Sequence, residues 1–452
     1  MNTANETLEL APWTTTLPSG WRVTRLDAVA DVMFSNVDKH TLDGEEPVRL
    51  CNYVDVYKND RINSTIEFME ASAEPREIRK FQIRRGDVLV TKDSETSDDI
   101  AIPSFVTEEL PRVLCGYHLA MIRPRLAGLE GAFLGWLHSS KAFRAQYEAN
   151  AVGVTRFGLS QYAFRAARVP LPPLPEQQRI AAYLDASCAA IDAAVAAKRQ
   201  QLETLDNLRN LTVHNAVTRG LNSNAKMKQA GLNWLSVVPA HWSLSRIRNV
   251  AKLSPAFSGK PPAFNEESTV VPMEFLNNDG SLDTTLKLPL EDITGGLTMF
   301  EAGDVLFAKI TPCMENGKGA FVEKLLTRYA FGSTEFHVLR PNLSVDGRFL
   351  YFYTFNPIFR AYAAENMQGA AGQKRVQSRF LKDTRLFLPP IAEQRSISQF
   401  LVKKDNENRT LFSQIEAQIS KLTAYRMSLI HECVTGQRRV TDIDINRVKA
   451  HG

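Results

Sequence analysis

The feature that most constrains the fold of this chain is a sequence motif that occurs twice, about half the chain length apart. Residues 171–185 read LPPLPEQQRIAAYLD, and residues 388–402 read LPPIAEQRSISQFLV. The two phrases align without a gap and share the Leu-Pro-Pro triplet, the Glu-Gln pair and a later leucine. A repeat has to be followed outward before any single motif is interpreted, because it determines the fold of the whole molecule.

Further copies lie upstream of each phrase, in the same order and at nearly the same offset. The paired segments are PSGWRVTRLDAVA (18–30) with PAHWSLSRIRNVA (239–251), RRGDVLVTK (84–92) with EAGDVLFAK (301–309), and MIRPRL (121–126) with VLRPNL (338–343). The unit of repetition is therefore a module of about half the chain, and we predict a duplicated, pseudo-symmetric molecule. We expect the matched Trp21 and Trp242 to be core anchors rather than base-stacking platforms.

After each Leu-Pro-Pro the apolar residues recur at spacings of three, four and seven, which is typical of a long α-helix. Neither stretch meets a glycine before Gly220 or Gly436. A helix of some forty residues spans about 60 Å, and its narrow apolar stripe needs a partner. We expect the two copies to pair as an antiparallel coiled coil; two helices packed separately on their own domains are the alternative. The stripes are Ile180, Leu184, Ile191, Val195, Leu202, Leu205 and Leu208, and Ile397, Leu401, Phe412, Ile415, Ile419, Leu422 and Leu429.

The regions upstream of the helices mix short β-like runs, such as GDVLVT and GDVLFA, with amphipathic pieces and turn signals. We therefore predict an α+β fold with two tandem globular domains, each followed by a long helix, related by pseudo-twofold symmetry. The predicted boundaries are 1–170 for the first domain, 171–221 for the central helix, 222–387 for the second domain, 388–440 for the C-terminal helix and 441–452 for a tail.

Composition places the chain among soluble globular proteins, with 44% hydrophobic and 23% charged residues. No apolar run approaches the roughly eighteen residues that cross a bilayer, so no membrane is expected. Residues 1–10 lack the basic and apolar segments of a secretory signal. The five scattered cysteines favour small buried thiols in a reducing cytoplasm over disulfides or a zinc site. A net charge of +4 is too mild to indicate a nucleic-acid partner by itself.

Two variable globular domains, each followed by an LPPL-x-EQ-like helix that ends in VTRG (217–220) or VTGQ (434–437), resemble the specificity subunit of type I restriction–modification enzymes. The resemblance covers nearly the whole chain, and its departures are small: VTRG in the first copy and Ala392 in place of a proline. It implies that each globular domain is a DNA target-recognition domain that reads one half of a bipartite, asymmetric site. It also implies that the helices set the gap between the two halves.

The same resemblance implies the partners. The helices would dock two methyltransferase subunits, and motor-nuclease subunits would join this core on double-stranded DNA in the cytoplasm. S-adenosylmethionine would be bound by the methyltransferase partner, and ATP and Mg by the motor-nuclease partner, so no cofactor is expected on this chain. Docking candidates stand at the helix starts, where capping is the alternative role. They are Glu176, Gln177, Glu393 and Gln394.

A search for catalytic motifs favours a non-catalytic chain. Residues 356–359 read NPIF and resemble the N/D-P-P-F/Y loop of amino-methyltransferases, but Ile358 replaces the second proline. Residues 315–319 (ENGKG) lack the glycine that a P-loop places six positions before its lysine, because Pro312 stands there. The repeated GDVL segment lacks the second carboxylate of a nuclease core, and we interpret it as a turn that enters a core strand. The alternative functions are a single-chain DNA methyltransferase or nuclease, and a coiled-coil scaffold whose globular ends bind protein.

Locally basic loops are the candidates for DNA contact, because phosphates attract Lys and Arg while planar polar groups read base edges. The stretches 152–162 (VGVTRFGLSQY) and 368–379 (QGAAGQKRVQSR) precede the two helices, and a further candidate loop is 309–321 (KITPCMENGKGAF). A solvated basic face is the alternative for any one of these residues. The predicted DNA contacts are Lys92, Arg156, Gln161, Lys309, Asn316, Lys318, Gln373, Lys374, Arg375 and Arg379; no metal site is predicted.

Overall fold

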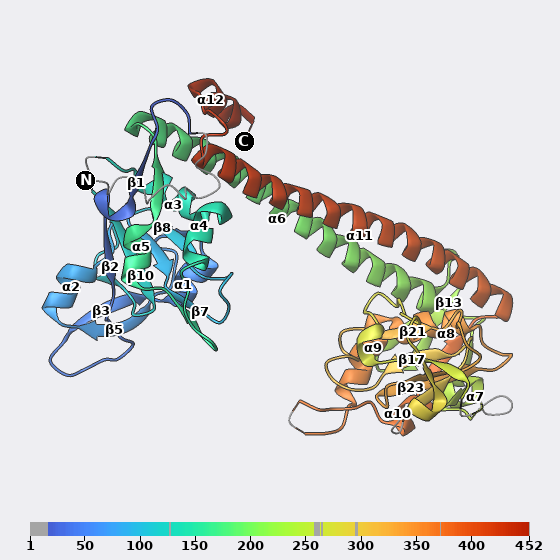
Figure 1. Cartoon of the computed structure of the whole chain (residues 1–452). Coiled ribbons are helices and arrows are strands. Elements are labelled where there is room, and N and C mark those ends of the chain that lie inside the picture. Colours follow the sequence, from blue (N-terminus) through green and yellow to red (C-terminus); the bar gives the residue numbers. More distant parts are fainter. Residues whose placement is uncertain are drawn as a thin grey trace. The chain divides into compact units, whose positions relative to one another are not determined.

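Figure 1 shows the computed structural model of the chain, which describes residues 17–125, 128–256, 263, 265–293, 297–370 and 372–451. The chain divides into two compact units. Unit 1 comprises Met1–Arg199 and Ala417–Gly452, and unit 2 comprises Gln200–Glu416. The division falls inside both long helices, so each unit holds one globular module together with part of each long helix.

Unit 1 is built on a five-stranded and a three-stranded sheet with two additional strand pairs. Its strands are β1 Arg22–Arg25, β2 Ala30–Phe34, β3 Glu46–Cys51, β4 Arg61–Ile62, β5 Met69–Ala73, β6 Val88–Thr91, β7 Asp93–Ser94, β8 Pro103–Val106, β9 Val113–Cys115, β10 Leu119–Pro124, β11 Phe157–Gly158 and β12 Arg168–Leu171. The larger sheet has the order β2-β10-β6-β8-β4 and the smaller one β5-β3-β9. β1 pairs with β12, and β7 pairs with β11.

Unit 2 is built on two four-stranded sheets with two additional strand pairs. Its strands are β13 Met227–Leu232, β14 Leu235–Pro239, β15 Ser243–Arg246, β16 Ala251–Leu253, β17 Glu267–Val271, β18 Lys287–Pro289, β19 Thr298–Phe300, β20 Val305–Ala308, β21 Gly319–Phe321, β22 Ala330–Gly332, β23 Phe336–Pro341 and β24 Arg385–Leu388. The sheets have the orders β16-β23-β20-β21 and β18-β17-β22-β19. β13 pairs with β14, and β15 pairs with β24.

The strand order repeats between the units, as the internal sequence repeat predicts. The run β2-β10-β6-β8 of unit 1 recurs in unit 2 as β16-β23-β20-β21. The registers agree as well: Met121 lies opposite Leu89 in unit 1, and Val338 lies opposite Leu306 in unit 2. The predicted duplication therefore extends from the sequence to the register of the central strands.

Each GDVL segment forms a turn that enters a central strand, β6 or β20. Asp87 and Asp304 are buried, and each accepts a hydrogen bond from the backbone N–H three residues earlier. Arg123 of β10 donates two hydrogen bonds of 2.8 and 2.7 Å to Asp87, and Arg340 of β23 donates two of 2.8 Å to Asp304. The interpretation of GDVL as a structural turn is confirmed, because an arginine compensates each buried carboxylate.

Two helices are far longer than the others, as predicted: α6 spans Leu174–Arg219 with 46 residues, and α11 spans Ile391–Val434 with 44. The predicted tail carries a further helix, α12, whose Ile445 and Val448 pack on the core of unit 1. The remaining α-helices are α1 Tyr53–Lys58, α2 Pro75–Phe81, α3 Gly131–Ser139, α4 Lys141–Glu148, α5 Gln161–Ala166, α7 Ile247–Val250, α8 Gly347–Phe355, α9 Pro357–Glu365 and α10 Ser378–Asp383, with α12 at Asp442–His451.

The long helices belong to the hydrophobic cores of the modules. The core of unit 1 includes residues from the first half of α6 and the last part of α11, whereas the core of unit 2 includes the last part of α6 and the first part of α11. The members in unit 1 are Ile180, Ala181, Tyr183, Leu184, Cys188, Ile191, Leu429, Ile430, Cys433 and Val434; those in unit 2 are Val213, Ala216, Val217, Ile397 and Leu401. Packing on the modules therefore stabilises both ends of each helix.

One member of the predicted apolar stripes does not pack inward. Leu208 is 55% exposed, whereas its neighbour Arg209 is only 8% exposed. The inward face of the helix at this level is therefore occupied by a charged residue that has acidic and aromatic partners. The prediction that Leu208 belongs to the apolar stripe was wrong. Its spacing of three residues from Leu205 fits a helical stripe, but that spacing alone does not determine whether the residue faces the core or the solvent.

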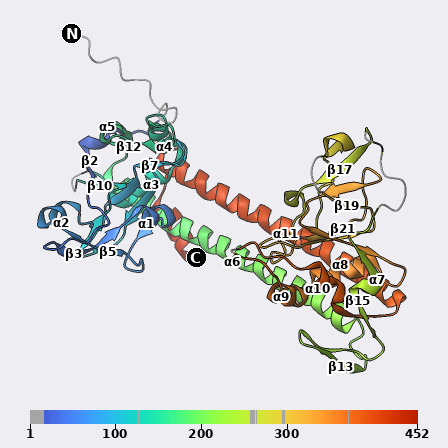
Figure 2. The ribbon, with the colours of Figure 1, turned by 90° about the horizontal axis from the view of Figure 1, so that it is seen from below.

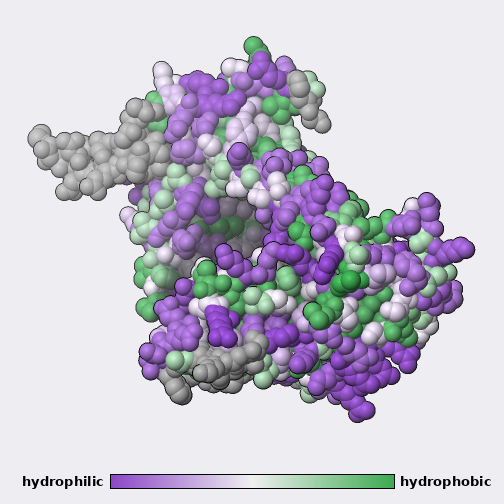
Figure 3. Space-filling model, turned by 90° about the vertical axis from the view of Figure 1, so that its right-hand side faces the viewer, coloured by the Kyte–Doolittle hydropathy of each residue, from purple (hydrophilic) through white to green (hydrophobic). Residues whose placement is uncertain are grey.

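Of the described helices, α6 is long enough, and in its alanine-rich first part apolar enough, to meet the length and composition of a membrane span. This departs from the expectation that no segment does so. Ile180 and Leu184 are buried in the core of unit 1, so this apolar face is used for packing within the protein. Figure 3 shows a face of the molecule on which hydrophilic residues predominate, with hydrophobic patches scattered among them.

The predicted core anchors and buried thiols are confirmed. Trp21 and Trp242 are buried, each in the core of its own unit. All five cysteines are free; four of them are buried, and Cys313 is partly exposed. Burial raises the pKa of the Cys188 and Cys433 thiols to about 12, so both stay protonated at neutral pH.

Candidate nucleic-acid interface

The two loops predicted to enter a DNA groove leave their modules at the same point of the framework. In unit 1, β7 follows β6 and pairs with β11, so that Gly158 lies opposite Asp93. In unit 2, Arg375 lies opposite Ile310 at the corresponding position after β20. Each chain segment then closes a small hairpin, through the pairs Val152–Gly158 and Gln368–Arg375. Figure 1 shows that each of these loops projects from the body of its own unit.

A matched glycine makes each hairpin possible. A Cβ atom on Gly153 would lie 2.0 Å from the carbonyl oxygen of Arg156, and one on Gly369 would lie 2.5 Å from that of Gln373. No side chain fits at such distances, so each hairpin requires glycine at this position. The two modules therefore share a hairpin backbone with a required glycine, while the side chains that the loop presents differ.

The loop of unit 1 presents a cluster of polar and aromatic side chains. Arg156 donates a 2.6 Å hydrogen bond to Asp93, whose second carboxylate oxygen lies 2.8 Å from Nδ1 of His118. The hydrogen bond with Asp93 raises the pKa of Arg156. Lys92 lies 4.4 Å from the ring centre of Tyr117, and its burial lowers its pKa more than Asp93 raises it. Val154, at the tip of the loop, is 93% exposed.

Gln161 is the first residue of α5 and points into the module. Its side-chain amide donates a 2.8 Å hydrogen bond to the carbonyl oxygen of Val32 in β2. In this arrangement Gln161 ties α5 to the edge strand of the sheet. Its predicted contact with DNA remains a prediction, and the structure gives it a structural role.

The loop of unit 2 presents a different set at the same place. Arg375 donates hydrogen bonds to both carboxylate oxygens of Glu335, at 2.9 and 3.1 Å, and this pairing raises its pKa. Gln373 and Lys374 are exposed in the hairpin. Lys309 lies at the base, where its backbone N–H bonds to the carbonyl oxygen of Glu335. Lys92 and His118 make the same backbone contact in unit 1.

The turn before β21 carries two predicted contacts that differ in orientation. Asn316 is exposed, with its backbone N–H bonded to the carbonyl oxygen of Pro312. Lys318, by contrast, turns inward and donates a 2.9 Å hydrogen bond from Nζ to the carbonyl oxygen of Met273. The sequence did not reveal this inward orientation, because the acceptor lies far away along the chain.

Arg379 lies on α10 and has a side chain that is 95% exposed. It lines a cleft of about 710 Å³ together with Trp234, Tyr362 and Phe380. The rings of Trp234 and Tyr362 stack with 5.9 Å between their centroids. The cleft is lined by residues of the β13–β14 hairpin and of the helices α9 and α10. Figure 2 shows these elements on the opposite side of unit 2 from β17 and β19.

The residues predicted at the helix starts are held inside the molecule. Oε1 of Gln177 accepts a 2.8 Å bond from the N–H of Glu130, and its amide donates to the carbonyl oxygens of Gly128 and Pro172. Gln394 repeats this pattern with the N–H of Asp346 and the carbonyl oxygens of Ser344 and Pro389. Both glutamines are buried, which gives them a structural role in each repeat. Their docking to a partner stays a prediction.

The neighbouring glutamates are also paired within their own units. Glu176 is buried and forms an ion pair of 3.0 Å with Arg439. Glu393 lies 2.7 Å from Nε2 of His241 and accepts a hydrogen bond from the indole N–H of Trp242. Each glutamate therefore has a packing role within its own unit, whereas capping of the helix start and partner docking by these glutamates remain predictions.

The structure brings some predicted contacts together and adds residues that the sequence did not suggest. Lys92 and Arg156 meet around Asp93, and Lys309 and Arg375 meet around Glu335. Sequence reasoning missed His118 and Glu335, although they occupy matched positions at the start of the repeated Arg-Pro strands. No group of three or more His, Cys, Asp or Glu residues that could hold a metal ion occurs in the described part of the chain.

A family model described as the type I restriction modification DNA specificity domain matches the chain twice, at residues 18–204 and 239–421. The chain belongs to this family. The two matches coincide with the two sequence repeats, so the predicted family resemblance is confirmed. As in the fold, the specificity domain occurs once with each long helix.

Among curated members of the specificity family, some are similar over part of this chain at higher identity, and another is similar over nearly the whole chain at lower identity. The EcoAI specificity subunit of Escherichia coli is 31% identical over 193 residues, which cover 42% of this chain and 32% of that protein. The EcoEI subunit of the same organism is 31% identical over 163 residues, or 27% of its length. This chain therefore matches between a quarter and a third of the length of each of these two relatives. The putative MjaX specificity subunit of Methanocaldococcus jannaschii is 22% identical over 434 residues, 94% of this chain and 95% of that one.

Solved structures show that the fold is shared along nearly the whole chain. A chain from a structure of the type I R-M system, described for its complex assembly and conformational transition, superposes with a TM-score of 0.69 at 18% identity. The superposition covers 93% of this chain and 98% of that one. The HsdS subunit of Thermoanaerobacter tengcongensis gives a TM-score of 0.50 at 18% identity, covering 94% and 98%.

Proposed function

We propose that this protein is the non-catalytic, sequence-specific DNA-binding subunit of a type I restriction–modification complex. Each module reads one half of a bipartite, asymmetric DNA site. Methylation of adenine, ATP-dependent translocation and DNA cleavage are carried out by partner subunits, which bind S-adenosylmethionine, ATP and Mg. Membership of the specificity family supports the general role, and the chemistry of the two modules supports the division of the site.

The observation that carries the proposal is the matched pair of hairpin loops. One framework position, marked by the pairs Asp93–Gly158 and Ile310–Arg375, holds a loop in both modules. The invariant part is backbone, and the variable part is the set of exposed side chains: Val154 and Arg156 in one loop, Gln373 and Lys374 in the other. A shared scaffold with different polar and apolar groups at its tip is what two readers of different base sequences require.

We further propose that α6 and α11 form an antiparallel coiled coil that fixes the gap between the half-sites and docks two methyltransferase subunits. Two contacts between the helices support this pairing: Arg426 lies 2.9 Å from Asp192 in unit 1, and Arg209 lies 2.7 Å from Asp405 in unit 2. Within each unit, the first half of one helix thus contacts the last quarter of the other. A stiff spacer of this kind is useful because DNA presents its groove at intervals of about 34 Å.

The first test is co-expression of the full chain with the methyltransferase subunit of its own restriction–modification system, followed by mapping of N6-methyladenine over a plasmid library. We expect methylation at one bipartite motif with a fixed gap. Methylation that does not depend on this chain would contradict the proposal. The purified chain alone is expected to transfer no methyl group and to cut no DNA; either activity would instead support the single-chain enzyme.

The second test exchanges residues 1–170 for the corresponding domain of another member of the family. We expect one half of the methylated motif to change while the other half and the gap are kept. A change in both halves would show that the modules do not read DNA separately. The reciprocal exchange of residues 222–387 serves as the matched control and should change the opposite half.

A further inference from the structure

A charged residue stands at the same repeat position in each long helix, where it faces the module. The residues are Arg209 of α6 and Arg426 of α11, and their side chains are only 10% and 19% exposed. Long charged side chains are seldom covered to this extent unless they have partners on several sides. Both arginines meet three different elements of their own unit.

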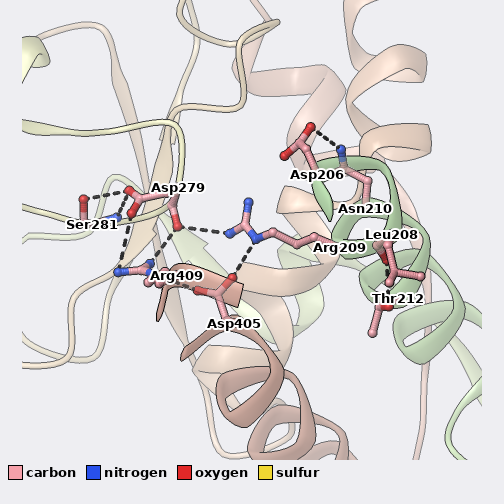
Figure 4. Close-up of polar contacts among 9 residues, drawn as sticks. All are labelled: Asp206, Leu208, Arg209, Asn210, Thr212, Asp279, Ser281, Asp405 and Arg409. Carbon is pink, nitrogen blue, oxygen red and sulfur yellow. Dashed lines mark hydrogen bonds and ion pairs between the residues drawn. The ribbon is translucent and has the colours of Figure 1, made fainter. Parts of the chain in front are cut away.

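In unit 2, Arg209 joins the opposite helix and a loop of the module (Figure 4), and it also contacts a helix of the module. Its Nε lies 2.7 Å from a carboxylate oxygen of Asp405 in α11. A terminal guanidinium nitrogen donates a 3.1 Å hydrogen bond to the carbonyl oxygen of Asp279, in the loop between β17 and β18. The guanidinium group also lies over the ring of Phe355 in α8, 4.4 Å from its centre.

In unit 1, Arg426 makes the corresponding set of contacts with different residues. Its Nε lies 2.9 Å from Asp192 in α6, which is the opposite helix. A terminal nitrogen donates a 2.6 Å hydrogen bond to Asp60, in the loop before β4. The guanidinium carbon lies 5.7 Å from the ring centre of Trp136 in α3. Since α3 and α8 occupy the same place in the two modules, the three-way arrangement is repeated.

The contacts around Arg209 are reinforced by a second arginine. Arg409 donates a 2.7 Å hydrogen bond to the carbonyl oxygen of Asp279 and one of 3.1 Å to Asp405. Burial would raise the pKa of Asp279, but hydrogen bonds from Ser281 and the nearby arginines outweigh that effect and lower it. The loop of the module therefore carries a negative charge where the two arginines meet it.

The geometry of this junction is sensitive to sliding. A guanidinium group is a rigid planar fork, and a displacement of one residue along a helix moves its attachment point by about 1.5 Å. Sliding of the module along the helices would remove the hydrogen bond from Arg209 to the loop. Sliding of one helix past the other would remove the ion pair between Arg209 and Asp405. An arginine of one long helix that bonds to the opposite helix and to the module loop thus holds the module at one position along the helix pair.

We propose that Arg209 and Arg426 are positioning residues that fix each recognition module on the spacer helices and thereby set the gap between the half-sites. The inference rests on the proposed function, because a gap exists only if each module reads one half of a site. It adds that the gap depends on these two junctions as well as on the length of the helices. The bases read within each half-site do not depend on them.

The test compares Arg209→Ala and Arg209→Lys with the unaltered chain, each co-expressed with the methyltransferase subunit. The substrate is a library in which the gap between fixed half-sites varies by one base pair at a time. We expect the preference for the native gap over its neighbours to fall about tenfold, since coupling between contacting charged groups is commonly of this size. The half-site bases should stay the same. Arg426→Ala should have the same effect through the other module.

Exposed lysines of α11 provide the matched controls: Lys403→Ala and Lys421→Ala remove one positive charge and should keep the native gap preference. Arg209→Lys keeps the charge and the apolar stem but loses the fork, so it tests the junction if the alanine variant does not fold. Weaker methylation at every gap, with the native preference kept, would overturn the inference. If the unaltered chain directs no bipartite methylation, the proposed function itself fails instead.

Discussion

His138 and Tyr147 are joined by a buried hydrogen bond of 3.0 Å between Nε2 of the imidazole and the phenol oxygen. Nδ1 of His138 lies 2.9 Å from the carbonyl oxygen of Leu134, one turn earlier in α3. The ring is therefore enclosed between α3 and α4 with a partner at each nitrogen. Burial lowers the pKa of His138 to about 4, because the charged form has no access to water there.

This histidine should make unit 1 sensitive to acid. The folded state keeps the imidazole neutral, whereas the unfolded chain binds a proton below a pH of about 6.5. Stability is therefore fully present above that pH and is lost as the pH falls towards 4, by about 3 kcal/mol in total. The check is chemical denaturation between pH 7.5 and 4.5. His138→Gln should show a shallower pH dependence than the unaltered chain, while exposed His40→Gln should not; equal slopes for all three would contradict the assignment.

The buried glutamines of the repeated phrase should be important for stability. Gln177→Ala leaves the N–H of Glu130 and two carbonyl oxygens without their partner, at a cost of about 3 kcal/mol. Gln394→Ala should have a similar effect in unit 2. The neighbouring Gln178 is exposed and provides the control, since Gln178→Ala should leave the denaturation midpoint nearly unchanged. A comparable loss in all three variants would mean that the hydrogen bonds are not the cause.

The hairpin glycines predict a defect confined to one half of the site. Gly153→Ala cannot keep the hairpin, because the added Cβ would overlap the carbonyl oxygen of Arg156. We expect methylation to lose its dependence on one half of the motif, with the other half and overall folding kept. Gly158→Ala adds the same methyl group to open space in the same hairpin and should behave like the unaltered chain. Loss of both halves in Gly153→Ala would point to a wider structural change.

Salt dependence can separate the lysines that reach DNA from those that do not. Lys374 is exposed in the hairpin of unit 2, whereas Lys318 is bonded to the carbonyl oxygen of Met273. In the methyltransferase complex, Lys374→Gln should reduce the slope of log K against log salt by about one, as expected when one phosphate contact is lost. Lys318→Gln should leave that slope unchanged. The opposite result would place Lys318 at the DNA and remove Lys374 from it.

Much of the architecture could be predicted because it is encoded locally. The long helices follow from apolar spacing and the absence of glycine, and the GDVL turns follow from their repetition before a β-like run. What could not be predicted depends on residues that are distant along the chain. Lys318 turns inward because it bonds to the carbonyl oxygen of Met273. Arg209, rather than Leu208, lies on the packed face of α6 because it contacts Asp405 and Phe355. Strand order is of the same kind, since it depends on which distant edges meet.

The sequence allowed the loops of the candidate site to be predicted, but not the side-chain contacts within them. Composition and matched position indicated the stretches 152–162 and 368–379, and both contain hairpins. The acidic partners of their arginines were not foreseen, because Asp93 and Glu335 precede those arginines by many residues and do not align with one another. Only the folded backbone brings each carboxylate to the base of its loop.

The carboxylates beside Arg156 and Arg375 have a consequence for how such a protein would search a genome. An arginine that already has an internal counterion gains little from a random phosphate, because it must first give up one anion to take another. If Arg156 and Arg375 contact DNA as proposed, the affinity for arbitrary sequence would therefore be low, and the protein would leave wrong sites quickly. A correct half-site can supply base edges and a fitted groove at once, which is enough to make the exchange favourable. On the proposed role, the ion pairs that Arg156 and Arg375 make in the free protein would therefore weaken binding to most of the chromosome.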